Sequence, residues 1–243
     1  MKIKIQYLLT AVAVTSILCL CVLAQRRETE NSQYISYTVN PKKQKVNLFW
    51  KDDQARIFKS IGNLKTWLSQ KQTKLVFAMN GGMYKADNSP VGLFIQHQKI
   101  ITPIDTASGA GNFYLKPNGI FYLTTSDSAF VVPANEFTCN KQIKFATQSG
   151  PMLLVNGKIH SAFTKSSTNR NIRNGVGILP GNMIVFAMSE TPVSFYEFAA
   201  YFKTMGCKNA LYLDGLVSRT YLPEKNWLQT DGNFGVIIGV TEK

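Results

Sequence analysis

The stretch VFAMNGGMYKADNSPVGLFIQ, Val76 to Gln96, joins two strand-like segments through an unusual exit from the first. Four apolar residues lead directly into Asn80, Gly81 and Gly82, and an apolar segment resumes only after a polar loop. Glycine permits positive φ and a close approach of the backbone to another group, so Asn-Gly-Gly suits a ligand-facing turn. The local pattern alone favours a plain tight turn in which the asparagine caps its own backbone.

Short strand-like segments recur along the rest of the chain. They are rich in β-branched and aromatic residues and are bounded by Gly, Asn and Pro. The Asn156-Gly157 pair within one of them predicts a two-residue hairpin turn. The segments are ISYTV, KVNLFW, LVFAM, GLFIQ, GIFYLT, AFVV, MLLVNGKI, GVGILP, MIVFAMS, ALYLD and GVIIGVT.

Two further segments have helical spacing. In SFYEFAAYFKTMG, Ser194 and Glu197 match a capping box and Gly206 is placed to end the helix. In ARIFKSIGNLKTWLSQ, the apolar residues keep helical spacing from Ile57 onward. Strands outnumber helices, so we predict an α+β fold, a single domain with a mixed β-sheet core and a few packed helices. The helix between MIVFAMS and ALYLD is compatible with a crossover that makes those strands parallel neighbours.

The first 24 residues have the composition of an export segment. Two lysines precede the apolar run YLLTAVAVTSILCLCVLA, and polar QRRETENSQ follows. This pattern predicts a signal peptide cleaved before Gln25 or, since about 18 apolar residues approach a membrane-spanning length, an uncleaved anchor. We therefore expect residues 25–44 to be an exported N-terminal segment and 45–243 a periplasmic or extracellular domain. Only residues 7–24 would touch the membrane.

The charge balance is strongly basic. Lys and Arg number 27 against 14 Asp and Glu, a net charge of +13 that becomes +11 without Lys2 and Lys4. Such an excess attracts anionic partners. No nucleic-acid module is recognisable, which disfavours DNA or RNA and leaves anionic lipid or a phosphate-bearing glycan. In an exported protein, Cys139 and Cys207 either form a disulfide or stay as two buried thiols.

Several common hydrolase signatures are absent. The only histidines are His97 and His160, and the sequence contains no HExxH, no CxxC pair, no G-x-S-x-G and no Walker loop. Asp87, Asp105 and Asp214 are too scattered to form a coordination signature, so no metal ligand is predicted and the cofactor is unknown. A hard cation held by backbone carbonyls stays an open alternative.

Polar residues also stand where other apolar segments begin or end. Ser149 and Gly150 precede Pro151, which fixes a change of chain direction before the next strand. Tyr84, beside the Asn-Gly-Gly turn, could pack on a sugar face or fill the core. Each of these patterns is equally well explained by a structural turn.

Two arginines and an aspartate indicate a functional site more strongly than these turns do. Arg170 and Arg173 lie just before a strand that should be buried, where a guanidinium needs a phosphate or a carboxylate partner. A salt bridge to Asp214 or Glu190 would satisfy that need as well as a phosphate would. Asp214 itself ends the apolar segment ALYLD, and Gly215 follows it. A carboxylate at that depth is either paired with arginine or tuned for chemistry.

Taken in order, NGGMY, PNGIFYL, TQSGPMLLVNGKIH, RNIRNGVGI and LYLDGLVS resemble the phosphodiester glycosidase family over roughly residues 45–242. The resemblance implies a mixed α/β fold and hydrolysis of the bond between an anomeric carbon and a phosphate. The best-known member of the family removes N-acetylglucosamine from a sugar-1-phosphate diester. The partner that the resemblance implies is a phosphate-bearing sugar or glycan.

Candidate site residues follow from the resemblance and the local patterns. We expect Arg173 and donors around Asn80 to stabilise the departing phosphate, and Asp214 to act as base or nucleophile. Leu216 and Val217 replace two glycines of the family's Asp-Gly-Gly-Gly-Ser segment, so the sugar identity is not carried over. The alternative is a non-catalytic envelope protein that binds an anionic glycan or a phosphate-containing polymer. The expected substrate-binding residues are Gly81, Gly82, Ser149, Gly150, Gly215, Ser218 and Arg170.

Overall fold

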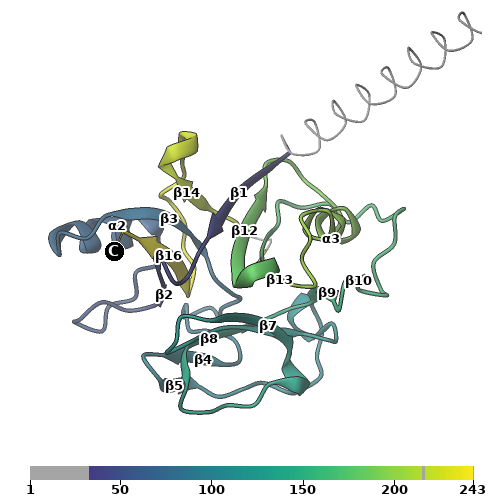
Figure 1. Cartoon of the computed structure of the whole chain (residues 1–243), viewed down its shortest axis with the longest axis horizontal. Helices are drawn as coiled ribbons and strands as arrows, with labels where there is room; N and C mark the ends of the chain where they lie inside the picture. Colours follow the sequence, from purple (N-terminus) through teal and green to yellow (C-terminus); the bar gives the residue numbers. More distant parts are fainter. Residues whose placement is uncertain (1–32, 215–216, 243) are drawn as a thin grey trace, which may run out of the picture. The chain divides into compact units, whose positions relative to one another are not determined.

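Residues 33–214 and 217–242 are described in this computed structural model (Figure 1). The chain divides into two compact units, residues 1–35 and 36–243, and the described part of the first is confined to residues 33–35. The expected signal peptide or anchor, residues 1–24, lies outside the described residues. Within the described ranges, no helix is both long and apolar enough to cross a membrane.

The described strands form three sheets, and every strand pair with a described register is antiparallel. One sheet, which we call sheet A, has the order β1-β12-β11-β13-β9-β10. Its central strands are almost wholly buried, which explains their continuous apolar sequences. Its strands are β1 (Tyr34–Val39), β9 (Met152–Val155), β10 (Lys158–Ile159), β11 (Asn174–Leu179), β12 (Met183–Ser189) and β13 (Asn209–Asp214).

The other two sheets have five strands each. Sheet B has the order β15-β14-β3-β16-β2, with β2 (Lys45–Phe49), β3 (Leu75–Asn80), β14 (Thr220–Leu222), β15 (Trp227–Leu228) and β16 (Ile237–Thr241). Sheet C has the order β5-β4-β8-β6-β7, with β4 (Phe94–Gln96), β5 (Lys99–Thr102), β6 (Gly119–Thr124), β7 (Ala129–Pro133) and β8 (Ile143–Ser149).

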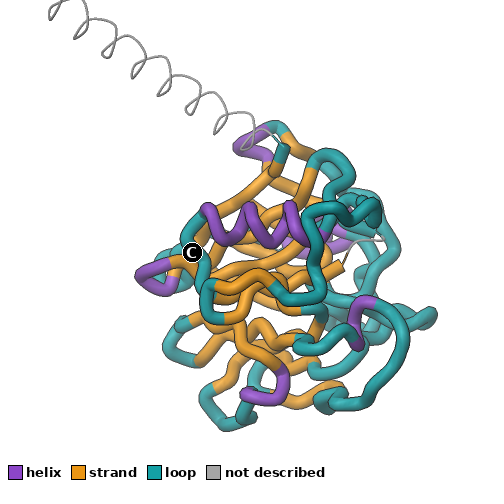
Figure 2. Tube along the Cα trace, turned by 90° about the vertical axis from the view of Figure 1, so that its right-hand side faces the viewer, coloured by secondary structure: helices purple, strands orange, loops and turns teal. Residues whose placement is uncertain are grey.

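Within residues 33–214 and 217–242, two α-helices accompany the sheets, and strand clearly predominates over helix (Figure 2). In α3 (Phe195–Thr204), both hydrogen bonds of the predicted Ser194–Glu197 capping box are present, and the helix packs against β9 and β10. In α2 (Ile61–Gln70), Ser60 is the N-cap, so the helix begins later than the apolar spacing predicts. Short 3-10 turns are η1 (Asn112–Tyr114), η2 (Ala134–Glu136), η3 (Pro180–Asn182) and η4 (Pro223–Lys225).

The mixture of many strands with helices confirms the predicted α+β class. The Asn156-Gly157 hairpin turn is also confirmed, since both residues have positive φ between β9 and β10. The expectation that the strands around α3 are neighbours is wrong. Strand β11 lies between β12 and β13 and pairs antiparallel with both, so these two run parallel without touching as neighbours. Strand β11 directly precedes β12 in the chain and forms a hairpin with it. This local pairing places β11 beside β12, in the position that β13 would have taken as a parallel neighbour.

The core between the sheets includes one phenylalanine from each of them. Phe77 of β3 stacks on Phe186 of β12 with 5.3 Å between ring centroids, and Phe121 of β6 meets Phe186 edge-on at 5.8 Å. All three side chains are almost completely buried. Each such burial contributes about 1.5–3 kcal/mol, so this contact helps to hold the three sheets in one arrangement.

Hydrogen bonds also join the sheets at one set of strand ends. The Thr147 hydroxyl of β8 donates to the Gly81 carbonyl just after β3 at 3.0 Å. The Ser149 hydroxyl donates to the Leu213 carbonyl of β13 at 2.8 Å. The carboxyl ends of β3, β8 and β13, each from a different sheet, therefore converge on one place.

Candidate active site

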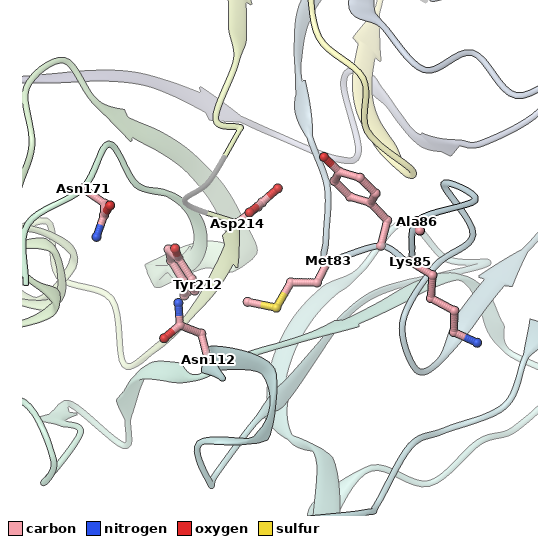
Figure 3. A pocket seen from close by; sticks show the side chains of 8 residues that line it. Met83, Lys85, Ala86, Asn112, Asn171, Tyr212 and Asp214 are labelled. Atoms are coloured by element: carbon pink, nitrogen blue, oxygen red, sulfur yellow. The ribbon is translucent and has the colours of Figure 1, made fainter. Parts of the chain in front are cut away.

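A cavity of about 410 Å³ opens where these strand ends converge (Figure 3). Its walls come from the loop after β3, from η1, from the segment before β11 and from the end of β13. In Figure 3 the Met83 side chain extends toward Tyr212 and Asn112, whereas Lys85 extends away from Asp214. The size suits a small organic ligand. The lining residues are Met83, Tyr84, Lys85, Ala86, Asn112, Asn171, Tyr212 and Asp214.

Asp214 is the last residue of β13 and is held by residues from three other segments. The Asn80 side-chain nitrogen Nδ2 donates to Oδ2 of Asp214 at 3.1 Å. The Asp214 backbone N–H donates to Oδ1 of Asn174 at 2.8 Å, and the Ser218 hydroxyl donates to its carbonyl at 2.9 Å. Asp214 is only 7% exposed, so its carboxylate faces the cavity from a well-defined position.

Asn80 organises the polar centre behind that carboxylate. Its Oδ1 accepts from Nδ2 of Asn174 at 2.8 Å and from the backbone N–H of Arg219 at 2.9 Å. Two donors on Oδ1 leave only one orientation for the amide, with Nδ2 toward Asp214. Asn80 and Asn174 are both fully buried, so this network sets the direction of the carboxylate.

Gly81, Gly82, Gly150 and Ser149 are not among the lining residues of the cavity. Gly82 has a positive φ of 151°, and a Cβ at Gly81 would lie 2.7 Å from a side-chain carbon of Ile238. A Cβ at Gly150 would lie 2.7 Å from the Cβ of Asn118. Glycine is therefore needed at these positions for backbone packing.

The remaining expected substrate-binding residues have mixed positions. Ser218 is buried and supports Asp214, as described above. Gly215 lies outside the described residues. Arg170 is exposed and pairs with Glu197 of α3 at 3.0 Å, and it does not line the cavity. The structure therefore brings Asn80, Asp214 and Ser218 together and places Arg170 in a surface ion pair.

Arg173 is 1% exposed, and its guanidinium is surrounded by neutral groups. Nε donates to the Val193 carbonyl at 2.9 Å, and Nη2 donates to the Asn169 carbonyl and Oδ1 at 3.0 and 3.1 Å. Nη1 lies 3.5 Å from the Tyr212 hydroxyl, and Cζ lies 3.6 Å from the centre of the Phe195 ring. In the described part of the chain Arg173 forms no ion pair, so the alternative of a salt bridge to Asp214 or Glu190 is not present.

The two tyrosines that line the cavity are kept neutral. Burial, and secondarily the negative charge of Asp214, raises the pKa of Tyr84 above its ordinary value. Burial also raises the pKa of Tyr212, with the charge of Arg173 opposing the shift and that of Asp214 adding to it. At neutral pH both side chains are therefore hydroxyl groups that can donate hydrogen bonds.

Sequence reasoning missed Tyr212 and Asn174. Tyr212 precedes Asp214 by two residues in an apolar strand, and strand alternation could have placed the two on one side. Asn174 directly precedes Gly-Val-Gly, but nothing in that local pattern shows that its amide contacts β3 and β13. Asn112 and Asn171 carry no local signal that separates them from other loop asparagines.

A metal site is not evident in the part of the chain that is described. Across residues 33–214 and 217–242, no three or more His, Cys, Asp or Glu side chains group in a way that could hold a metal ion. Cys139 is exposed and Cys207 is buried, and both are free thiols, so the disulfide alternative is not present.

A family model described as phosphodiester glycosidase matches residues 73–240, which include the whole cavity. The chain belongs to the phosphodiester glycosidase family. This phosphodiester glycosidase domain is 36% identical over 188 residues to the uncharacterized protein YigE of Escherichia coli (strain K12), covering 77% of this chain and 73% of that protein.

Solved structures share the phosphodiester glycosidase fold. The zebrafish N-acetylglucosamine-1-phosphodiester alpha-N-acetylglucosaminidase catalytic domain, auto-inhibited by its pro-peptide, aligns with TM-score 0.56 and 12% identity over 87% of this chain and 89% of that one. A hypothetical protein from Synechocystis aligns with TM-score 0.54 and 13% identity over 86% of this chain, which spans 59% of that protein. A Burkholderia pseudomallei protein, named as a candidate exported protein, aligns with TM-score 0.56 and 10% identity over 85% of this chain and 73% of that one. At these identities the likeness concerns the fold.

Proposed function

We propose that this protein is an exported hydrolase that cleaves a sugar-1-phosphodiester at the bond between the anomeric carbon and the phosphate oxygen. The observation that carries the proposal is the Asp214 carboxylate, which lines a cavity of about 410 Å³ in a member of the phosphodiester glycosidase family. Asn80 and Asn174 hold that carboxylate in place through buried hydrogen bonds. A fixed carboxylate in a small cavity suits attack at a carbon that develops positive charge.

The proposed reaction requires one carboxylate and does not depend on a strong general acid. Asp214 is the one carboxylate among the described residues that line the cavity. A phosphate monoester is a good leaving group, so the bond between C1 and the phosphate oxygen can break without full protonation of that oxygen. Asp214 removes a proton from water while the water oxygen bonds to C1, and the phosphate leaves with the bonding electron pair.

A second route is open to the same carboxylate. Asp214 bonds to C1 as a nucleophile, the phosphate leaves with the bonding pair, and water then hydrolyses the glycosyl ester. The first route inverts the configuration at C1 and the second retains it. Proton NMR of the newly released sugar distinguishes the two, because the anomeric protons of the two configurations resonate separately.

The other lining residues suit a singly charged phosphodiester. Asn112 and Asn171 bring amide groups, and Tyr84 and Tyr212 bring neutral hydroxyls. Neutral donors stabilise one negative charge that is spread over two phosphoryl oxygens. The basic N-terminal segment followed by an apolar run supports export, so the proposed substrate is a phosphodiester-linked glycan of the cell envelope or its surroundings.

The test is hydrolysis of a panel of sugar-1-phosphodiesters by the purified chain in water enriched in ¹⁸O, with and without divalent metal. We expect release of free sugar carrying ¹⁸O at C1 and of unlabelled phosphate monoester. Label in the phosphate instead would show cleavage at phosphorus and would contradict a glycosidase.

The matched pair of variants is Asp214→Asn and Asp127→Asn. The first keeps an oxygen that can accept from Asn80 and should lose turnover. Asp127 has a half-exposed side chain, does not line the cavity and should be dispensable. If both variants retain activity, Asp214 is not in the reaction. If the unaltered chain binds sugar-1-phosphates without any turnover, the protein is a binder of phosphate-bearing glycans.

A further inference from the structure

The Arg173 guanidinium is a buried positive charge without an anionic partner among the described residues. Burying a charge is costly unless other groups compensate for the lost water. Here the carbonyls of Val193 and Asn169 and the face of the Phe195 ring do so. These groups stabilise the cation without neutralising it, so its field extends to the neighbouring cavity wall.

Tyr212 is the residue that stands between that charge and the cavity. Arg173 is not a lining residue, whereas Tyr212 is. Nη1 of Arg173 reaches the Tyr212 hydroxyl at 3.5 Å, and the Tyr212 ring meets the Phe195 ring edge-on with 4.8 Å between centroids. Tyr212 is thus held at its ring and at its hydroxyl by the residues that surround the guanidinium.

The direction of the hydroxyl proton follows from donor and acceptor chemistry. Arginine can only donate, so the Tyr212 oxygen accepts from Arg173 and its own proton must point elsewhere. Hydrogen bonding from Asn112 also favours the oxygen as an acceptor. Burial keeps the proton on the oxygen by raising the pKa of Tyr212. Tyr212 lines the cavity and Arg173 does not, so a ligand in the cavity can accept that proton.

From this geometry we infer that Tyr212 donates a hydrogen bond to a phosphoryl oxygen of the substrate, and that Arg173 is a positioning residue that acts through Tyr212. The inference rests on the proposed function for the identity of the substrate. It also orients the substrate, because the anionic phosphate would lie toward the Arg173 side of the cavity and the anomeric carbon beside Asp214. It differs from the expectation that Arg173 itself clamps the phosphate.

The experiment is a double-mutant cycle on the full chain with Tyr212→Phe, Arg173→Met and the combined variant. Each single variant should lower kcat/KM for a sugar-1-phosphodiester by about tenfold to a hundredfold, the effect of one hydrogen bond to a charged group. The kcat/KM of the combined variant should be no lower than that of the less active single variant, because both changes remove the same contact. Tyr84→Phe with Arg173→Met is the matched cycle, and its effects should multiply.

Binding of N-acetylglucosamine-1-phosphate, measured by calorimetry, is a readout that does not depend on turnover. Tyr212→Phe and Arg173→Met should each weaken that binding by about tenfold relative to the unaltered chain, and Arg173→Lys should restore part of it. Tyr212→Phe keeps the aromatic packing, so the inference stays testable if the Arg173→Met variant does not fold.

The outcomes separate the two proposals. Turnover by the unaltered chain together with a Tyr212→Phe variant of full activity and binding overturns the inference and leaves the proposed function in place. Binding that depends on Tyr212, without turnover of any diester, supports the inference and contradicts the proposed hydrolysis. Multiplying effects of Tyr212→Phe and Arg173→Met would show independent contacts and would overturn the positioning role. Absence of both binding and turnover overturns both proposals.

Discussion

Asn80 and Asp214 are 134 residues apart in the chain, yet Nδ2 of Asn80 lies 3.1 Å from Oδ2 of Asp214. The two residues end β3 and β13, which belong to different sheets. Asn174 bridges them, because its amide donates to Asn80 and accepts from the Asp214 backbone. The carboxylate therefore reaches its position only when both sheets are in place.

Replacing Asn80 with alanine should destabilise the protein and impair turnover together. The Asn174 amide and the Arg219 backbone N–H would lose a buried acceptor, and Asp214 would lose a donor. We expect a loss of about 3 kcal/mol in the free energy of unfolding, measured by urea denaturation. Asn135→Ala, at an exposed position, should stay within about 0.5 kcal/mol. Equal effects of the two substitutions would contradict the role of the network.

Replacing Arg170 with alanine should leave the reaction almost unchanged. Its partner is Glu197 on the surface of α3, and exposed ion pairs contribute at most about 1 kcal/mol to stability. We expect kcat/KM within about twofold of the unaltered chain, since an exposed residue away from the cavity alters binding by little. A large loss of kcat/KM with unchanged stability would return Arg170 to the substrate-binding residues.

Stability should fall at high pH because of Tyr212. Burial raises the pKa of Tyr212 in the folded protein, whereas an unfolded tyrosine ionises near pH 10. Below about pH 10 both states keep the proton, and above it only the unfolded state releases it, so the free energy of unfolding decreases as the pH rises. The slope is about 1.4 kcal/mol per pH unit for one such residue. Urea unfolding between pH 8 and pH 11 should show a steeper fall in the unaltered chain than in Tyr212→Phe, and identical slopes would refute the assignment.

The thiols of Cys139 and Cys207 should react very differently. Cys139 is exposed, whereas burial raises the pKa of the Cys207 thiol to about 12. Only the thiolate is nucleophilic, so iodoacetamide at pH 8 should label Cys139 and leave Cys207 unmodified until denaturant is added. Peptide mass spectrometry separates the two sites. Recovery of a peptide with both cysteines joined would show a disulfide in place of the two free thiols.

Local patterns predicted most elements of this fold. The Asn156-Gly157 turn and the Ser194–Glu197 capping box depend on neighbouring residues, and both are present. The role of the segment before Pro151 was harder to predict from sequence. Gln148 and Ser149 are the last residues of β8, and not only a turn before the next strand. Their side chains bond to Leu93, Asp105 and Leu213, which are distant in sequence. No local pattern contains those partners.

The candidate site shows the same division between local and distant information. Sequence alone was sufficient to place Asn80 and Asp214 at strand ends, because strand alternation and turn chemistry act over a few residues. The family was indicated by the resemblance of several motifs in order along the chain. The packing of three sheets decided that these ends meet and that Asn174 joins them. It also placed Arg173 behind Tyr212 and Arg170 beside Glu197, although the two arginines are three residues apart. Burial and hydrogen-bond partners depend on the whole fold, so neighbouring arginines in one segment acquired different surroundings.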